Sequence, residues 1–303
     1  MIVQRIAWSI PTLLVVVTLA FFLMRAAPGG PFDLERPLDP AVMENLHRIY
    51  RLDEPLWRQY LAYLSALAHG DLGPSYYWRD FTVNELFAKA LPISAKLGAT
   101  ALALALVVGV AAGAFAAARA KSAADTAVTA AASLGVTLPT FVVAPLLQLV
   151  FGVWLKMLPV GGYGDGATRN LVLPVIVLAA PQVAAVARLT RNAMIEALAS
   201  PASRTLRAYG LPRRVVLAHA FRAALIPLVS YLGPAAAGIM TGSVVVETIF
   251  GIPGVGRYFV EAALNRDYTL AMGAVVLVAV SVIAVNLLAD IAYAFIDPRV
   301  RLE

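Results

Sequence analysis

The sequence predicts an all-α polytopic membrane protein with six transmembrane helices. Of its 303 residues 60% are hydrophobic and only 14% are charged, and the mean hydropathy of +0.78 lies well above the range of soluble proteins. A helix that crosses a bilayer needs about 20 mostly apolar residues. Six runs that lack Asp, Glu, Lys and Arg have about this length or more: Ile6–Met24, Leu97–Ala118, Thr126–Leu155, Asn170–Ala187, Ala223–Val246 and Tyr268–Ala289.

The first and third runs need separate interpretation. The first is predicted to be a retained anchor and not a cleaved signal peptide, because Arg25 stands where small residues would lead to a cleavage site. The third has 30 residues, too many for one perpendicular crossing, and contains Pro139 and Pro145. We therefore expect a kinked or tilted helix with one end outside the bilayer. Two short passes are the disfavoured alternative, because their connecting turn would lie in lipid.

The distribution of basic residues predicts the orientation. Loop 188–222 carries seven arginines against one acidic residue, and loop 119–125 carries two basic residues against one acidic residue. Loops 156–169 and 247–267 carry two basic residues each, against one and three acidic residues. Because cytoplasmic loops are enriched in Lys and Arg, both termini and the first two loops are expected in the cytoplasm. Segment 28–95 then lies outside.

The outer segment 28–95 is too long for a bare connection and is expected to contain helices. Pro55 is suited to the first position of one helix, and Gly70 follows the end of the same apolar pattern. Thr82 and Glu85 have the spacing of a capping box, which predicts a second short helix.

Several kinds of chemistry find no support in the sequence. There is no cysteine for a disulfide or a thiolate site, and neither a G-x4-G-K-[ST] phosphate-binding loop nor an H-E-x-x-H or G-x-S-x-G motif occurs. The apolar runs hold no ionisable group except at edges, such as Glu247 and Asp290. A proton- or sodium-coupled carrier usually keeps such groups near mid-membrane, so a secondary carrier and a membrane enzyme are both disfavoured. The arginines lie beside apolar runs, which favours a role in orientation over nucleic-acid binding.

The basic loop 188–222 reads as two helices. Ser203 is expected to cap a short helix, Arg204–Tyr209, that ends at Gly210. Pro212 is expected to open the next helix, which continues into the fifth apolar run. A short helix tied rigidly to a spanning helix is suited to insert into a cleft on a cytoplasmic partner. The alternative is that the arginines only enforce topology and contact lipid phosphates.

The loop resembles the cytoplasmic coupling loop of binding-protein-dependent ABC importer permeases. That family's general pattern is E-A-A, three residues, Gly, and a downstream Leu-Pro; here Arg204-Thr205-Leu206, Gly210 and Ile226-Pro227 stand in these places. The changed triplet and the longer Gly-to-Pro distance are both similar to the dipeptide, oligopeptide and nickel branch. The stretch TGSVVVETIFGIPGVG, residues 241–256, resembles that branch's second hallmark. DLGPSYYWRD, ALNRDY and AFIDPRVR resemble the B-type membrane subunit of oligopeptide importers.

This resemblance implies a type I ABC importer permease fold with a small extracytoplasmic helical insertion after the first helix. It implies a permease subunit in the bacterial cytoplasmic (inner) membrane, forming half of a pathway for oligopeptides, with a dipeptide or nickel permease as the alternative. The implied partners are a second, C-type permease subunit, two ABC ATPase subunits, an extracytoplasmic peptide-binding protein, the peptide and membrane lipid. The chain would have no catalytic residue, metal or cofactor of its own, because ATP and Mg would be bound by the ATPases.

The expected organisation is an N-terminal transmembrane helix at 1–27, an extracytoplasmic segment at 28–95 and a permease core at 96–303. Within the core, the resemblance and the helical pattern together assign ATPase coupling to Arg204, Thr205, Leu206, Arg207, Tyr209, Gly210 and Leu211. Polar and aromatic residues in the fifth run and at its outer end are expected to line the translocation pathway: Ser230, Tyr231, Thr241, Ser243 and Glu247.

Overall fold

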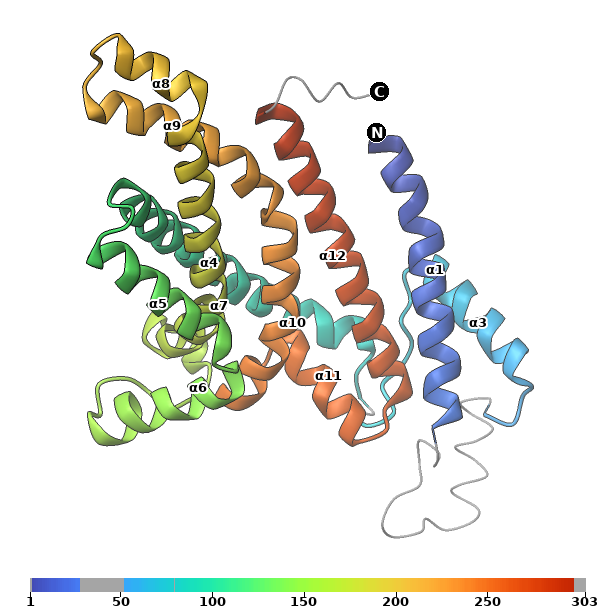
Figure 1. The fold of residues 1–303 in the computed structure, drawn as a ribbon. Helices are drawn as coiled ribbons and strands as arrows, with labels where there is room; N and C mark the ends of the chain where they lie inside the picture. Colours follow the sequence, from blue (N-terminus) through green and yellow to red (C-terminus); the bar gives the residue numbers. More distant parts are fainter. Residues whose placement is uncertain (1, 28–51, 79, 297–303) are drawn as a thin grey trace.

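The structure, a computed structural model, describes residues 2–27, 52–78 and 80–296, and in this part of the chain the regular elements are helices (Figure 1). In chain order they are α1 (Ile2–Ala26), α3 (Leu56–Ala68), α4 (Val83–Ala118), α5 (Ala123–Thr137), α6 (Thr140–Leu147), the π-helix η1 (Gln148–Trp154), the 3-10 helix η2 (Gly164–Gly166), α7 (Thr168–Ala199), α8 (Pro201–Ala208), α9 (Arg213–Ser230), α10 (Leu232–Phe250), α11 (Val255–Leu264) and α12 (Tyr268–Ile296).

Among the described residues, five helices are long and apolar enough to span a membrane. They are α1, α4, α7, α10 and α12, and a sixth span is formed if α5 and α6 with η1 count as one. The predicted all-α polytopic class is therefore confirmed. The N-terminal end of α1, the C-terminal end of α12 and the helix α8 lie at one end of the molecule, whereas α11 lies at the other (Figure 1).

The third apolar run is bent far more sharply than we expected. The two halves meet at an angle of 102°, so the expected single kinked helix is wrong. The physical cause is Pro139, which has no N–H to continue the ladder and disfavours helical backbone at the residue before it. Leu138 is accordingly extended, and α6 begins directly after Pro139.

The helix α4 begins earlier than the sequence suggested. The capping box is present: Thr82 Oγ1 accepts from the Glu85 N–H, and Glu85 Oε2 accepts from the Thr82 N–H. It does not start a separate short helix, however, because the helix continues without a break for 36 residues. At 1.5 Å per residue this is roughly 54 Å, longer than the ~30 Å hydrocarbon core. The expected boundary at 95 thus falls inside α4.

The fifth apolar run is divided at Tyr231 into α9 and α10. As expected, α9 starts just after Pro212 and continues into the apolar run. Pro234 explains the division. In a continuous helix the residue at 234 would donate its N–H to the Ser230 carbonyl, but proline has no N–H and its ring clashes with that carbonyl.

The core of the molecule is the packing of α4, α7 and α10 around one buried apolar cluster, whose members include Leu97, Val177 and Phe250. Small residues allow the close approach of α4 and α7. A Cβ added at Gly113 would lie 2.3 Å from the backbone oxygen of Ala187. Helices in lipid associate through such close packing, because lipid tails are as apolar as the side chains.

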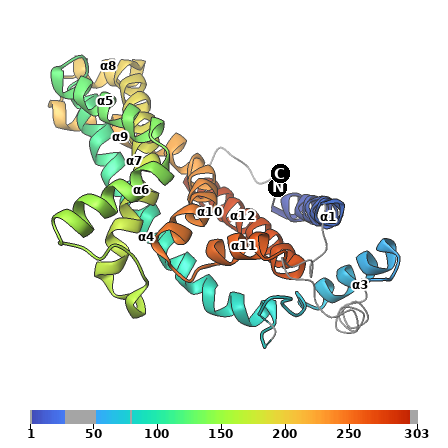
Figure 2. The same ribbon diagram turned by 90° about the horizontal axis from the view of Figure 1, so that it is seen from below.

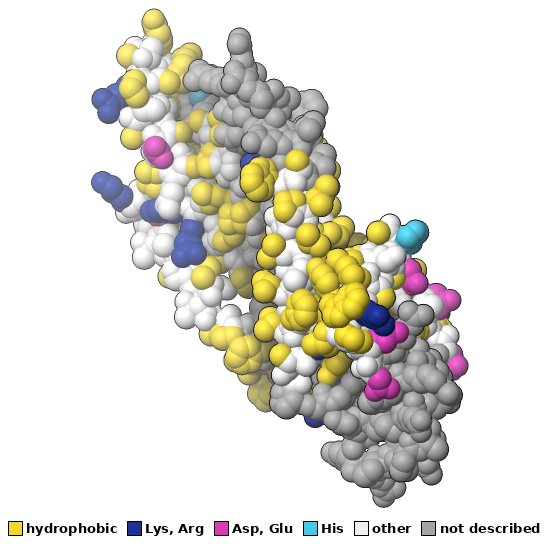
Figure 3. All heavy atoms as spheres, turned by 90° about the vertical axis from the view of Figure 1, so that its right-hand side faces the viewer, with side chains coloured by type: hydrophobic (Ala, Val, Ile, Leu, Met, Phe, Trp, Pro, Cys, Tyr) yellow, Lys and Arg dark blue, Asp and Glu magenta, His cyan; other side chains and the backbone are white. Residues whose placement is uncertain are grey.

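The helix α1 stands apart from this core and packs on α12 through a second cluster that includes Val17, Phe21 and Met272. The opposite side of α1 is exposed and apolar, with Trp8 at 68% and Leu23 at 68% exposure. Figure 3 shows hydrophobic side chains gathered along the middle of this face, with several basic side chains toward its upper left and most acidic ones toward its right. Seen from below in Figure 2, α1 and α3 lie at the opposite side of the molecule from α5 and α8.

The loop before α4 is held to the start of α12 by Asp267, which is fully buried. One carboxylate oxygen caps α12 by accepting from the Leu270 N–H at 3.0 Å. The other accepts from the Ser75 hydroxyl at 2.5 Å and from the N–H groups of Tyr76 and Tyr77. The loop and α12 therefore share one fully bonded carboxylate.

Candidate functional site

The basic loop forms a helical hairpin, α8 and α9, that projects from the end of α7 (Figure 1). Its first helix begins three residues earlier than predicted. Ser200 is the capping residue, because its hydroxyl accepts from the Ser203 N–H at 3.3 Å, and Pro201 occupies the first turn. Ser203, which we expected to be the cap, is buried and its hydroxyl donates to the Ala197 carbonyl at 2.7 Å.

The predicted stop at Gly210 is present as a Schellman motif. Gly210 has φ +73°, its N–H donates to the Arg207 carbonyl, and the Leu211 N–H donates to the Leu206 carbonyl. No atom lies within 4 Å of a Cβ built at Gly210. The requirement for glycine at this position is therefore one of backbone conformation alone.

The arginines of α8 form hydrogen bonds to the end of α7. Arg207 donates through Nη2 to the Leu198 carbonyl at 2.7 Å, and Arg204 donates through Nε to the Ala199 carbonyl at 3.3 Å. The last carbonyls of a helix have no partner within it, so these side chains satisfy the end of α7 and fix α8 to it. Both arginines remain exposed.

The outward surface of α8 combines these cations with an apolar group. Tyr209 is 79% exposed and Leu211 is 39% exposed, whereas Leu206 is partly buried. The hydroxyl of Thr205 donates to the Pro201 carbonyl within the helix. A large exposed tyrosine beside arginines is a composition typical of protein contact surfaces.

The structure separates the five candidate pathway residues into two groups. Ser230 and Thr241 are exposed, and with Pro234, Val245 and Thr248 they form one stripe along the end of α9 and the length of α10. Within α10, the spacings of seven, four and three residues between these positions place them on one face of the helix. Tyr231 is partly buried and its hydroxyl donates to Gln182 Oε1 at 3.0 Å.

Ser243 and Glu247 face the interior instead. Ser243 is 7% exposed and Glu247 is fully buried. Glu247 Oε2 accepts from the N–H groups of Gly256 at 2.7 Å and Arg257 at 3.3 Å, in the first turn of α11. In this structure the Glu247 carboxylate therefore caps α11 and is not exposed. The sequence signal for this role was the short glycine-rich connection that follows the glutamate.

An apolar groove of about 530 Å³ lies between α4, α10, α11 and α12. Ser94, Ser243 and Ser281 are its hydroxyl-bearing lining residues, and the rest of the lining is apolar or glycine. Ser94 Oγ also accepts from the Val255 N–H at 2.9 Å, which ties α4 to the start of α11. Among the described residues, no group of His, Cys, Asp or Glu has an arrangement that could hold a metal ion.

The comparisons agree with this architecture. The chain is 48% identical to the oligopeptide transport system permease protein OppB of Salmonella typhimurium over 99% of this chain and 98% of the relative. It is 47% identical to OppB of Haemophilus influenzae over the same shares of the two chains. The dipeptide transport system permease protein DppB of Bacillus subtilis is 40% identical over 96% of this chain and 94% of the relative.

The sequence profile of one family covers most of the core described above. It is the binding-protein-dependent transport system inner membrane component family, and it matches residues 109–302, which include α8, α9 and the connection from α10 to α11. The chain therefore belongs to the family of inner membrane components of binding-protein-dependent transport systems.

Proposed function

We propose that this chain is a permease subunit of an ABC importer and forms half of the translocation pathway for oligopeptides. Relatives named as oligopeptide permeases are 47–48% identical over nearly the whole chain, which supports this substrate over a dipeptide. The fold observation that carries the proposal is the capped helix α8, fixed to the end of a spanning helix and presenting exposed cations and an exposed tyrosine.

In this proposal the chain works as one of several subunits. A second, C-type permease completes the pathway, two ABC ATPases bind and hydrolyse ATP with Mg, and an extracytoplasmic binding protein delivers the peptide. The chain is not an enzyme in this scheme. It converts nucleotide-driven closure of the ATPases into alternating access, because α8 follows its ATPase and α7 follows α8.

Uptake by the reconstituted complex tests the substrate. With both permeases, both ATPases and the loaded binding protein in vesicles, we expect ATP-dependent uptake of labelled oligopeptides. Labelled dipeptides and labelled nickel, each with the same complex, are the competing substrates. Uptake of nickel alone, or of dipeptides with no oligopeptide, would contradict the proposal.

The proposed orientation places both termini and α8 in the cytoplasm and the segment before α4 outside. Single cysteines in this cysteine-free chain test it. Suitable positions are Tyr77, which is 54% exposed, and Ala120, which is exposed in the turn after α4. An impermeant thiol reagent added to intact cells should label Tyr77→Cys and spare Ala120→Cys until the membrane is opened. The reverse pattern would refute the orientation.

Gly210→Val should uncouple the transporter without unfolding it. A side chain at φ +73° costs roughly 1 kcal/mol or more, rising for a branched residue, and this strain turns α8 away from its partner. We expect normal assembly with loss of the ATP hydrolysis that the loaded binding protein stimulates, measured on the purified complex.

Two variants provide the controls. Gly210→Asn should keep stimulation, because asparagine tolerates the left-handed region. Gly70→Val introduces the same strain at φ +76°, also in open space but near the end of α3, and should keep stimulation as well. If Gly210→Val kept full stimulation, the basic loop would have no coupling role and would serve only to set the orientation in the membrane.

The exposed stripe of α9 and α10 is proposed to face the pathway. Hydroxyls recur along it in an otherwise apolar span, although each also donates to its own helix backbone, as Thr241 does to the Ala237 carbonyl. Ser230→Trp and Thr241→Trp should lower uptake at unchanged complex yield, whereas the small, polar Thr241→Ser should not. Normal uptake by both tryptophan variants would remove these residues from the pathway.

A further inference from the structure

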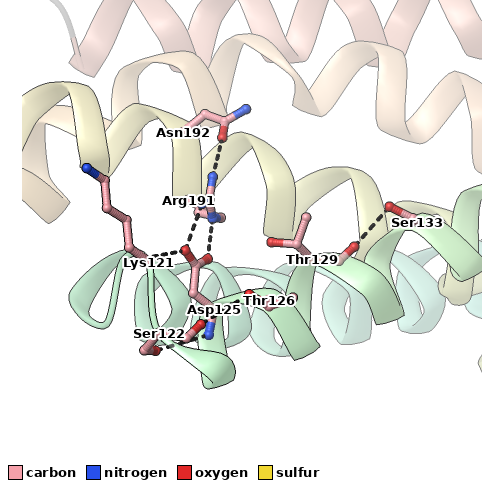
Figure 4. A network of polar contacts seen from close by, with 8 residues as sticks. All are labelled: Lys121, Ser122, Asp125, Thr126, Thr129, Ser133, Arg191 and Asn192. Carbon is pink, nitrogen blue, oxygen red and sulfur yellow. Dashed lines mark hydrogen bonds and ion pairs between the residues drawn. The ribbon is translucent and has the colours of Figure 1, made fainter.

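The turn between α4 and α5 is held by a partly buried ion pair that the proposed coupling role has not used. Asp125, in the first turn of α5, has a side chain that is 5% exposed, and Arg191 of α7 is 25% exposed. Arg191 Nε donates to Asp125 Oδ1 at 2.5 Å and Nη2 donates to Oδ2 at 2.8 Å (Figure 4). Such a two-point pair fixes orientation as well as distance.

Further hydrogen bonds complete this network on both sides. Asp125 Oδ2 also accepts from the Lys121 N–H at 2.8 Å, which closes the turn on the carboxylate. Arg191 Nη1 donates to Asn192 Oδ1 at 3.1 Å. The guanidinium thus uses three of its N–H groups, and the pair is rigid in a way that an exposed surface pair is not.

A second arginine holds the same turn from the other side. Arg213 opens α9, and its Nη2 donates to the carbonyl of Ala118, the last residue of α4. The Ala118 carbonyl is one of the last four of α4, which have no hydrogen-bond partner within the helix. The turn after Ala118 is therefore bonded to α7 through Arg191 and to α9 through Arg213.

These two contacts flank α8 in the chain. Arg191 lies eight residues before the end of α7, about 12 Å along the helix, and Arg213 follows α8 after the four residues 209–212. Arg204 and Arg207 tie α8 to the end of α7. A displacement of α8 would therefore move the turn after α4 both through α7 and Arg191 and through α9 and Arg213.

We propose that Asp125, Arg191 and Arg213 form a clamp, and that they are positioning residues for coupling. The clamp makes α4 and the bent α5–α6 segment follow α8, in addition to α7 and α9. A movement of α4 would change the apolar groove, because α4 forms one wall of it beside α10 and α12. This inference rests on the proposed contact between α8 and an ATPase.

The test compares variants that loosen the clamp without burying an unpaired charge. The double variant Asp125→Asn with Arg191→Gln removes both charges together, which buried pairs tolerate far better than loss of one partner. The measured quantity is the ratio of ATP hydrolysis with and without the loaded binding protein, on the complete complex. We expect this ratio to fall by about two- to thirty-fold, the range found when residues between coupled sites are changed.

Lys121→Gln is the matched control in the same turn. It removes a neighbouring exposed charge but leaves the backbone N–H that Asp125 accepts, so the stimulation ratio should not change. Arg213→Gln and Arg214→Gln form a second matched pair. Arg213 makes the contact to α4, whereas its neighbour Arg214 makes no such contact in the described structure, so only Arg213→Gln should lower the ratio.

Stability is measured on each variant to separate positioning from simple folding. If the double variant has a lower melting temperature but an unchanged stimulation ratio, the clamp is only structural and the proposal is wrong. Equal loss in Lys121→Gln would also overturn it. If the double variant does not assemble, Arg191→Lys is measured instead, because lysine keeps the positive charge but cannot form the two-point pair. An unchanged stimulation ratio in Arg191→Lys refutes the clamp.

The Gly210→Val complex distinguishes this inference from the proposed function on which it rests. If Gly210→Val loses stimulation and the clamp variants keep it, α8 couples without the turn and the clamp alone is refuted. If neither Gly210→Val nor the clamp variants lose stimulation, the coupling role of α8 fails as well.

Discussion

Each helix end leaves backbone groups without a partner in the helix, and where water does not reach them they need partners within the protein. The chain meets this need with polar side chains from neighbouring helices. Arg204 and Arg207 complete the end of α7, Arg213 contacts the end of α4, Glu247 caps α11 and Asp267 caps α12. Each of these five charged side chains thus bonds to the end of a helix.

This use of side chains explains why arginine is preferred over lysine in the basic loop. Topology requires positive charge, which lysine supplies equally well. A guanidinium has five donors in a fixed plane and can satisfy a carbonyl while keeping other donors for a second partner. Arg207 shows the advantage, since it bonds both the Ser203 and Leu198 carbonyls and still lies exposed at the surface. One residue type therefore supplies positive charge, satisfies helix ends and stays at the surface.

Features set by neighbours in the sequence were predictable, and features set by distant partners were not. The capping box of Thr82 and Glu85 and the stop at Gly210 depend on local geometry, and both occur as expected. The sequence marked Asp125 only as the acidic residue of a loop and Glu247 only as a charge at the edge of a span, because their partners lie on other helices. Likewise, the prolines indicated that the third apolar run would bend, but the angle of 102° depends on how its halves pack against α7 and α10.

The contact between Ser75 and Asp267 joins residues that are 192 positions apart in the chain. During synthesis it forms only after the polypeptide has emerged as far as the start of α12, so this part of the loop before α4 completes its hydrogen bonds late. Until then the Ser75 hydroxyl and the N–H groups of Tyr76 and Tyr77 lack the carboxylate that they share in the folded protein. Asp267 thereby makes the ordering of an early segment depend on the arrival of a late one.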